Sequence, residues 1–443
     1  MQENKLERQF TPLSLIIFAL PNMVMMVFLS LYTIVDGIFI SRYAGTLALS
    51  ATNMSYPLTN VQLAIGIMLG TGGSAVIARK MGLGQAEEAK EDFTFLVATA
   101  LFMGFLLAFL ELTFLKPLLH FLGVSTAQMP ACVPYTRILM YFSPMLFLQT
   151  IFQIFFVTAG KPQLGLAITV LGGVANMVLD YIFMGVMDMG VIGAAIATGI
   201  GYTLPAIAGL IYFFFCRKGS LYFIKCRFHG KLLVATCSNG ISELASNLAA
   251  AVTNFLFNII FMKFWAEDGV AAITIILYFQ FVFSAVFMGF SLGISPIISY
   301  KYGARDTGQL KKIVRFSLGF LLLCSIGIYI LSRLSLSFSL GVFTEPHGKV
   351  YDIAYAGFPI YALSFLLMGI SILASALFTA FSNGVASAII SLSRTFVFLV
   401  ACLLLLPYFW GKAGIWFAVP LAELLGLLVS IAFLFWGRKK YQY

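Results

Sequence analysis

Long apolar stretches separated by short polar segments dominate the hydrophobic pattern of the chain. A helix that crosses a bilayer needs about 20 predominantly apolar residues, and twelve stretches meet this requirement. The pattern therefore predicts an all-α membrane protein with twelve transmembrane helices. We expect these spans at residues 13–39, 48–78, 94–119, 132–158, 163–185, 190–215, 232–263, 270–299, 316–342, 353–379, 385–407 and 413–436.

Composition supports this class of protein, and the positions of the charged residues predict how the chain is oriented in the membrane. Of the 443 residues, 61% are hydrophobic and 10% are charged, whereas a soluble domain is usually roughly a quarter charged. The net charge of +10 comes from Lys and Arg in short loops, which indicates membrane topology rather than nucleic-acid binding. With the N-terminus inside, 19 of the 27 basic residues fall in inner segments. We therefore expect both termini to be cytoplasmic, in an inner or plasma cell membrane.

A single constant shift in numbering relates the two halves of the chain. It takes Gly82 in SAVIARKMGLG to Gly303 in SPIISYKYGAR, and it also relates glycines and basic residues towards the chain end. Because each repeat holds six predicted spans, an even number, the two halves cross the membrane in the same direction. Transporters with parallel repeats bind substrate near the interface of their halves and rock one half against the other. The repeat predicts two pseudo-symmetric six-helix lobes, residues 1–221 and 222–443.

Acidic residues inside the spans are the first candidates for function. Asn176 and Asp180 lie four residues apart, on one face of the fifth predicted helix. A carboxylate at mid-depth in a bilayer costs about 2.5 to 3.5 kcal/mol, so such a residue indicates an ion or substrate site. The simpler alternative is a buried acid that only forms a hydrogen bond with a neighbouring helix.

Asp36 lies in the outer part of the first predicted span, at a depth similar to that of Asp180. If spans 1 and 5 touch, Asp36, Asn176 and Asp180 form one polar cluster. Two adjacent carboxylates repel each other, so that one can hold a proton near neutral pH. The same oxygens, with Asn176 and backbone carbonyls, suit Na⁺ as an alternative. A third interpretation pairs Asp36 with the nearby Arg42.

In the second half, Glu243 and Arg394 lie deep within predicted spans 7 and 11. The repeat places these spans beside each other, so Glu243 can form an ion pair with Arg394. Alternatively, Glu243 faces a central cavity, where it would attract cations. Asn254 and Asn258 extend the polar face of span 7. Glu423 has no acidic counterpart in the first half under the constant shift. Glu111 lies towards the outer end of the third predicted span, and we expect it to be an interfacial residue. Two apolar residues, Met25 and Phe152, are candidates for a pliable part of the cavity wall.

Nothing in the sequence indicates an enzyme. It lacks a phosphate-binding GxxxxGK[ST] loop, so we expect no ATP-driven step. Cysteines and histidines show no metal-ligand spacing, and we expect no cofactor beyond a coupling ion, H⁺ or Na⁺.

The chain resembles the multidrug and toxic compound extrusion (MATE) family over nearly its whole length, and most of all its MepA-like bacterial branch. The resemblance rests on LYTIVDGIFISRYAG, GTGGSAVIARKMGLGQ, the NxxxD of Asn176 and Asp180, and GVIGAAIATGIGY. It implies two six-helix lobes around a central cavity, and export of small cationic, amphipathic drugs in exchange for H⁺ or Na⁺ by a protein that we expect to be monomeric. The coupling residues it implies are Asp36, Asn176 and Asp180. The sequence lacks the helix-10 acid of some members, which favours coupling in the first lobe.

Two other functions compete with a secondary antiporter. A lipid-linked oligosaccharide or polysaccharide flippase of the same superfamily would need a cationic cavity for pyrophosphate, yet the first span carries an acid and Arg394 is the one deep basic residue. A membrane receptor or scaffold would not need the matched acids.

Overall fold

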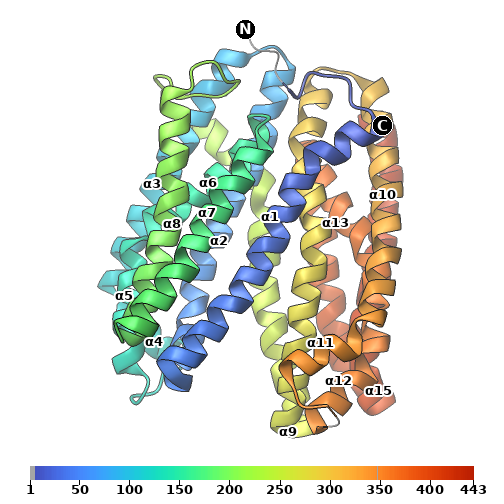
Figure 1. Ribbon diagram of the computed structural model, residues 1–443. Helices are drawn as coiled ribbons and strands as arrows, with labels where there is room; N and C mark the ends of the chain where they lie inside the picture. The colour runs from blue at the N-terminus through green and yellow to red at the C-terminus, as the bar shows by residue number, and fades with distance from the viewer. Residues whose placement is uncertain (1–4, 347) are drawn as a thin grey trace.

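The computed structural model describes residues 5–346 and 348–443, and in this part of the chain helices account for the regular structure (Figure 1). Most helices run roughly parallel or antiparallel to one another, as expected where a bilayer leaves backbone groups no partner outside their own helix. Both ends of the chain lie at one end of the bundle, here called the near end; the opposite end is the far end. The first half contains α1 Pro12–Phe39, η1 Ile40–Ala44, α2 Gly45–Gly82, α3 Ala86–Thr113, α4 Leu115–Phe121, α5 Met129–Tyr141, α6 Ser143–Thr158, α7 Pro162–Asp180, η2 Tyr181–Val186 and α8 Gly190–Phe215.

The second half repeats this order with two long elements, α9 and α15. Its members are α9 Gly230–Gly303, α10 Thr307–Leu334, α11 Leu336–Phe343, α12 Lys349–Tyr361, α13 Ser364–Ala380, α14 Gly384–Leu392, η3 Ser393–Phe398 and α15 Leu399–Tyr441. A straight helix of 74 residues would be about 111 Å long, far more than a bilayer. The backbone leaves the helical conformation at Ala266 (φ 52°) in α9 and at Gly411 (φ 55°) in α15, so each element is two helices joined by a sharp turn.

The span count agrees with the hydropathy pattern. Eight described helices are long and apolar enough to cross a membrane, and ten result if each of two bent pairs, α5 with α6 and α12 with α13, is one span. Both pairs bend by 55°. Dividing α9 and α15 at their turns is consistent with the predicted twelve.

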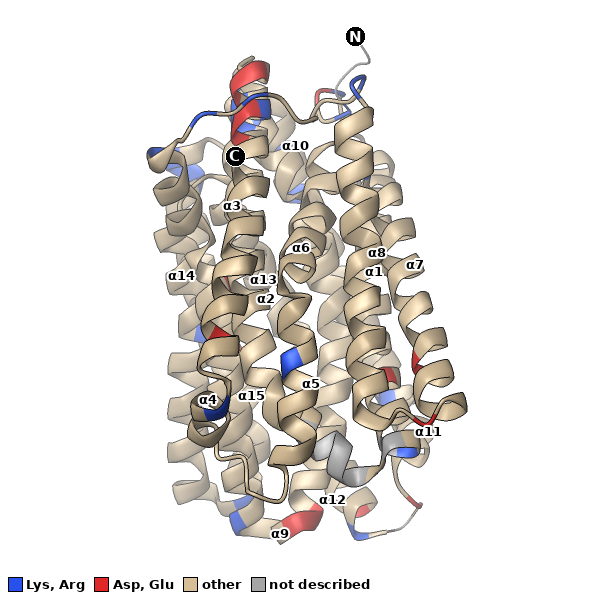
Figure 2. Ribbon diagram, turned by 90° about the vertical axis from the view of Figure 1, so that its left-hand side faces the viewer, with Lys and Arg blue, Asp and Glu red and all other residues tan. Residues whose placement is uncertain are grey.

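Two predicted boundaries are wrong by more than two turns. We expect spans to begin at 94 and 316, but α3 begins at Ala86 and α10 at Thr307. Their first two turns carry Glu87, Glu88 and Lys311 among other charged residues, which a search for apolar runs excludes. These turns lie at the near end, where charged side chains gather (Figure 2). The helices therefore extend beyond the apolar stretch that predicts them.

Helices of the first half occupy one side of Figure 1 and helices of the second half the other, with α1 and α2 packed against α9 between them. The predicted lobe boundary at 221/222 stays a prediction.

Between the halves, a side chain at Gly82 would collide with the carbonyl oxygen of Tyr300, and one at Gly303 with that of Arg79. Because the shift that takes Gly82 to Gly303 also takes Arg79 to Tyr300, the contact is reciprocal. Glycines thus let the backbones of the two repeats touch.

Deeper along the same interface, the pattern recurs with different partners. Gly72 and Gly240 lie where α2 meets the first part of α9, against the carbonyl oxygens of Thr236 and Met68. Gly289 and Gly293 lie against α1. The close approach continues over several helical turns, so the near part of the interface is tightly closed.

The segment that precedes each half docks on the other half at the near end. Before α1, the backbone amide of Phe10 donates to Gln309 of α10 (3.3 Å), and Lys301 donates to the carbonyl of Glu7 (2.8 Å). Before α9, His229 lies 3.1 Å from Asp92 of α3, and Asp92 also pairs with Lys80 (2.5 Å). Lys80 and Lys301 are related by the repeat, so both crossing segments are held near equivalent lysines.

Candidate functional site

Asp36 and Asp180 lie near the far ends of two neighbouring helices. Asp36 is in the last turn of α1 and Asp180 ends α7, and each helix continues into a π-helical turn, η1 or η2. Such turns are frequent at functional sites. The helices pack closely because Gly173 of α7 lies against the ring of Phe28. The condition on which the predicted cluster depends, contact between spans 1 and 5, is therefore met.

The two aspartates interact with each other. Apart from this contact, three of their buried oxygens, Asp36 Oδ1 and both oxygens of Asp180, have no hydrogen-bond partner among the described residues. Asp180 is fully buried, and Asp36 is half-buried. Within the same part of the chain no ion pair joins Asp36 to Arg42, which is exposed, so the alternative pairing is not observed.

Asn176 lies one turn before Asp180 and is also fully buried. Its Nδ2 donates to Thr198 Oγ1 of α8 (3.4 Å), while its Oδ1 has no partner among the described residues. The close approach of α8 follows from Gly201, whose missing side chain leaves room for Asn176. The cluster thus presents carboxyl and amide oxygens that no described cationic side chain pairs with, a donor set that suits a proton or a hard cation such as Na⁺.

Three tyrosines surround the acid pair and complete the cluster. Asp36 acts electrostatically on Tyr32 of α1, Tyr135 of α5 and Tyr202 of α8. Tyr32 precedes Asp36 by four residues, so the helical period alone could have suggested it. Tyr135 and Tyr202 come from other helices, and no pattern in the sequence indicates their place.

The second half contains a different polar cluster. Arg394 Nη1 donates to Glu423 Oε1 at 2.9 Å, and Glu423 is buried. Of the two alternatives for Glu243, the direct ion pair with Arg394 is not observed, although Arg394 does attract Glu243 electrostatically. Glu243 is half-buried on α9, and a role in the central cavity stays a prediction. The sequence does not predict the Arg394–Glu423 pair, because the repeat gives Glu423 no acidic counterpart and so offers no reason to place it beside Arg394. Tyr361 lies near Glu423 and donates to Gln280.

The remaining predicted cavity residues do not gather in one place. Asn254 and Asn258 are exposed on α9. Met25 and Phe152 are buried, Met25 beside the Thr169 hydroxyl (Oγ1–Sδ 3.4 Å) and Phe152 stacked on Phe213. In this conformation these two side chains belong to the packed core, and a role in the cavity stays a prediction.

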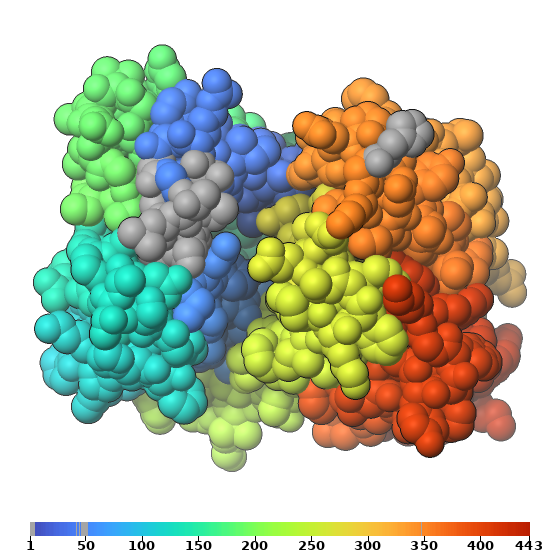
Figure 3. Space-filling model, turned by 90° about the horizontal axis from the view of Figure 1, so that it is seen from below, coloured from blue at the N-terminus to red at the C-terminus, as the bar shows by residue number. Residues whose placement is uncertain are grey.

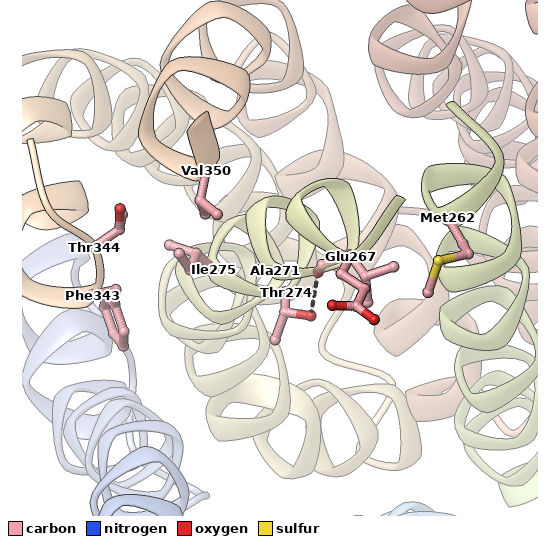
Figure 4. Close-up of a pocket in the computed structure, with 9 residues that line it drawn as sticks. Met262, Glu267, Ala271, Thr274, Ile275, Phe343, Thr344 and Val350 are labelled. Atoms are coloured by element: carbon pink, nitrogen blue, oxygen red, sulfur yellow. Dashed lines mark hydrogen bonds between the residues drawn. The ribbon is translucent and has the colours of Figure 1, made fainter. Parts of the chain in front are cut away.

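Seen from the far end, the space-filling view is hollowed between the two halves (Figure 3). The helices diverge there, in contrast to the glycine-lined contact at the near end. A separate cavity of about 550 Å³ lies at the far end of the second half, beside the turn of α9 (Figure 4). Met262, Phe343 and Val350 line it together with the carboxylate of Glu267, and none of the predicted cavity residues does.

A model of the MatE family matches the chain twice, at residues 21–182 and 244–404. The shift of the repeat takes the first matched range almost onto the second, and together the two cover most of the chain. Among curated proteins, the chain is similar to the multidrug export protein MepA of Staphylococcus saprophyticus, with 22% identity over 94% of this chain and 91% of that protein. The multidrug export protein MepA of Staphylococcus aureus is 22% identical with the same coverage.

Solved structures show the same fold. A MATE protein in complex with MaL6 superposes with a TM-score of 0.93 at 20% identity, covering 100% of this chain and 99% of that one. A multidrug resistance MATE family transporter of the MOP superfamily, in an outward-facing conformation, gives the same TM-score and identity with 100% and 98% coverage. At this level of identity the likeness describes the fold alone.

Proposed function

We propose, from the premise that the chain belongs to the MatE family, that it is a multidrug exporter that moves small cationic, amphipathic compounds out of the cell in exchange for a cation. One observation carries the proposal: Asp36 and Asp180 lie together with buried oxygens, and no cationic side chain pairs with them among the described residues. Such a carboxyl pair needs a proton or a bound cation to be stable within the membrane.

The coupling ion is H⁺ or Na⁺, held at Asp36 and Asp180 with Asn176 beside them. The unpartnered oxygens of all three side chains support this role. The protein carries no resident cofactor and no metal in this proposal, and it works as a monomer within the lipid bilayer.

With both termini in the cytoplasm, as the positions of Lys and Arg favour, the near end faces the cytoplasm. The hollow between the halves then opens outward and the glycine-lined contact closes the inner side. Export proceeds by alternating access. A cation that binds the acid pair from outside favours the conformation open to the cytoplasm, where a cationic drug binds and is then carried outward.

The flippase alternative receives no support from the charges of this chain. A site for a lipid-linked pyrophosphate needs several cationic side chains within the spans, yet Arg394 is already paired with Glu423. We therefore keep export of cations as the proposed function.

The test is drug transport in proteoliposomes under an imposed ion gradient, first of pH and then of Na⁺. We expect Asp36→Asn and Asp180→Asn to reduce gradient-driven drug movement to the level of liposomes without protein. Glu87→Gln, on the exposed near end of α3, is the matched control and should transport like the unaltered protein. Full transport by both aspartate variants would refute the coupling role, and the gradient that drives the unaltered protein identifies the ion.

A further inference from the structure

Glu111 is a buried acid that the coupling site does not use. It lies near the far end of α3 with 7% of its surface exposed, whereas the sequence suggests an interfacial residue. Its Oε2 accepts a hydrogen bond from Nε2 of Gln62 on α2, and the same nitrogen lies 3.1 Å from the sulfur of Met140 on α5. Gln62 is 1% exposed and its Oε1 has no partner among the described residues. The carboxyl group is therefore enclosed by three helices.

No cation balances this carboxyl group within the described part of the chain. The charged residues of α2 and α3 other than Glu111 lie at the near ends of these helices. The basic groups on the other elements packed nearby are Lys116 and His120 of α4 and Arg137 of α5; all three are exposed, and none forms an ion pair with Glu111. The remaining titratable groups are Tyr56 of α2, and Cys132, Tyr135 and Tyr141 of α5; α6 has none. A carboxylate removed from water without a counter-charge is far less stable than the protonated acid.

A row of hydroxyl groups leads from Gln62 towards the aspartates. Thr52, Ser55, Thr59 and Gln62 follow one another at intervals of three, four and three residues, so they share one face of α2. Their outer members span about 15 Å. Ser55 shares a hydrogen bond of 2.7 Å with Thr136 of α5, and both side chains are buried.

The row ends at a tyrosine of the acid cluster. Thr52 forms a hydrogen bond with Tyr135, the α5 tyrosine on which both Asp36 and Asp180 act electrostatically. Each hydroxyl group can donate and accept at once, so the members of the row bond to α5 or to the backbone of α2, where Thr59 donates to the carbonyl oxygen of Tyr56 (3.0 Å). We call this row of α2 and α5 side chains the polar seam.

We propose that Glu111 is a second proton-binding site of the first half, connected by the polar seam to Asp36 and Asp180. Its carboxylate takes up a proton and releases it by the same step reversed, so that only an O–H bond forms or breaks. The seam links this site to the aspartate pair through the contacts of α2 with α5. The link to the aspartates rests on the proposed function, whereas proton binding by Glu111 itself does not.

Infrared spectroscopy of the purified full-length protein tests proton binding directly, because a protonated carboxyl group has its own carbonyl-stretch band. We expect Glu111→Gln to lose one titrating component of this band and the aspartate variants to lose a different one. The exposed control Glu87→Gln should leave the band as it is. An unchanged band in Glu111→Gln would overturn the proposal.

A second variant covers the case in which Glu111→Gln does not fold. Glu111→Asp keeps an acid at this site and should retain the component at a shifted frequency; if the band does not shift, the proposal is wrong. The seam is tested with the double variant Ser55→Ala, Thr136→Val. It should keep the Glu111 component yet lose pH-driven drug uptake, and undiminished uptake would contradict the connection. Failure of the aspartate variants to affect transport would instead count against the proposed function, so the two failures are distinguishable.

Discussion

Both halves of this protein bury acids deep among their helices, away from the near end, but among the described residues only the second half supplies a fixed counter-charge to them. There, Glu423 pairs with Arg394 at 2.9 Å. In the first half, Asp36 and Asp180 share a cluster in which no described side chain supplies a positive charge. The repeat shows where the difference arose, because the shift that relates the halves takes Gly173 to Arg394 and Tyr202 to Glu423.

This difference assigns distinct tasks to equivalent places in the fold. Where the second half carries the guanidinium of Arg394, the first half has a glycine that lets α1 and α7 pack closely. The guanidinium group of Arg394 balances part of the negative charge of the second cluster without any ion from solution. The first cluster has no such partner and depends on a mobile cation, which is the property that an ion-coupled transporter needs.

The largest effect on stability is expected when the fixed cation is removed. Arg394→Gln leaves Glu423 as a buried acid without a counter-charge, with the half-buried Glu243 nearby. Breaking a buried pair costs about 3 to 5 kcal/mol. Thermal unfolding of the detergent-solubilised protein measures this loss. The double variant Arg394→Gln, Glu423→Gln should recover most of it. If the single variant were as stable as the unaltered protein, the contrast between the halves would lose its basis.

A smaller effect is expected where the halves are alike. Gly82→Ala and Gly303→Ala each force a methyl group against a carbonyl oxygen of the other repeat, and such overpacking typically costs about 1 to 3 kcal/mol. Because the contacts are reciprocal, the two variants should lower the unfolding temperature by similar amounts. Gly319→Ala is the control, since its methyl group would meet open space on α10. Clearly unequal losses of unfolding temperature would show that the two reciprocal contacts do not contribute equally to stability.

The smallest effect concerns the loop before α10. Burial acts to raise the pKa of Asp306, but the backbone amide of Gln309 and the ammonium group of Lys301 outweigh it and hold the pKa below its usual value. Because the folded-state pKa is lowered, this contribution is present above the usual carboxyl pKa of about 4 and is lost as the pH falls through the folded-state value.

Asp306→Asn should therefore destabilise the protein at neutral pH by about 1 kcal/mol, a modest value because the side chain is 30% exposed. Unfolding temperatures measured from about pH 7 down to about pH 3 should show the difference shrinking with acidity. A constant difference across this range would mean that the charge of Asp306 plays no part. Asp92→Asn, which removes a fully buried acid of the first half, should cost more at neutral pH.

The sequence predicts the helices and the acid pair but not most of their partners. Apolar length suffices for the spans, and helical spacing suffices to place Asn176 and Asp180 on one face. Asp36 is predicted at a similar depth, but it joins them only because α1 and α7 touch, a condition that the sequence left open. Tyr135, Tyr202 and the Arg394–Glu423 pair depend on which helices touch, which periodicity does not encode. Glu111 illustrates the same limit: its place near a helix end suggests an interface, but it is buried and bonded to Gln62 of another helix.

The backbone contact at Gly82 and Gly303 has a consequence for the origin of the molecule. Gly82 lies against Tyr300, and Gly303 lies against Arg79, which is the residue equivalent to Tyr300 in the other half. Two identical subunits meet across a two-fold axis in the same reciprocal way. A chain of half this length could therefore pair with a copy of itself through the same surface. In the present chain the two halves nonetheless differ, since one has Arg394 where the other has Gly173.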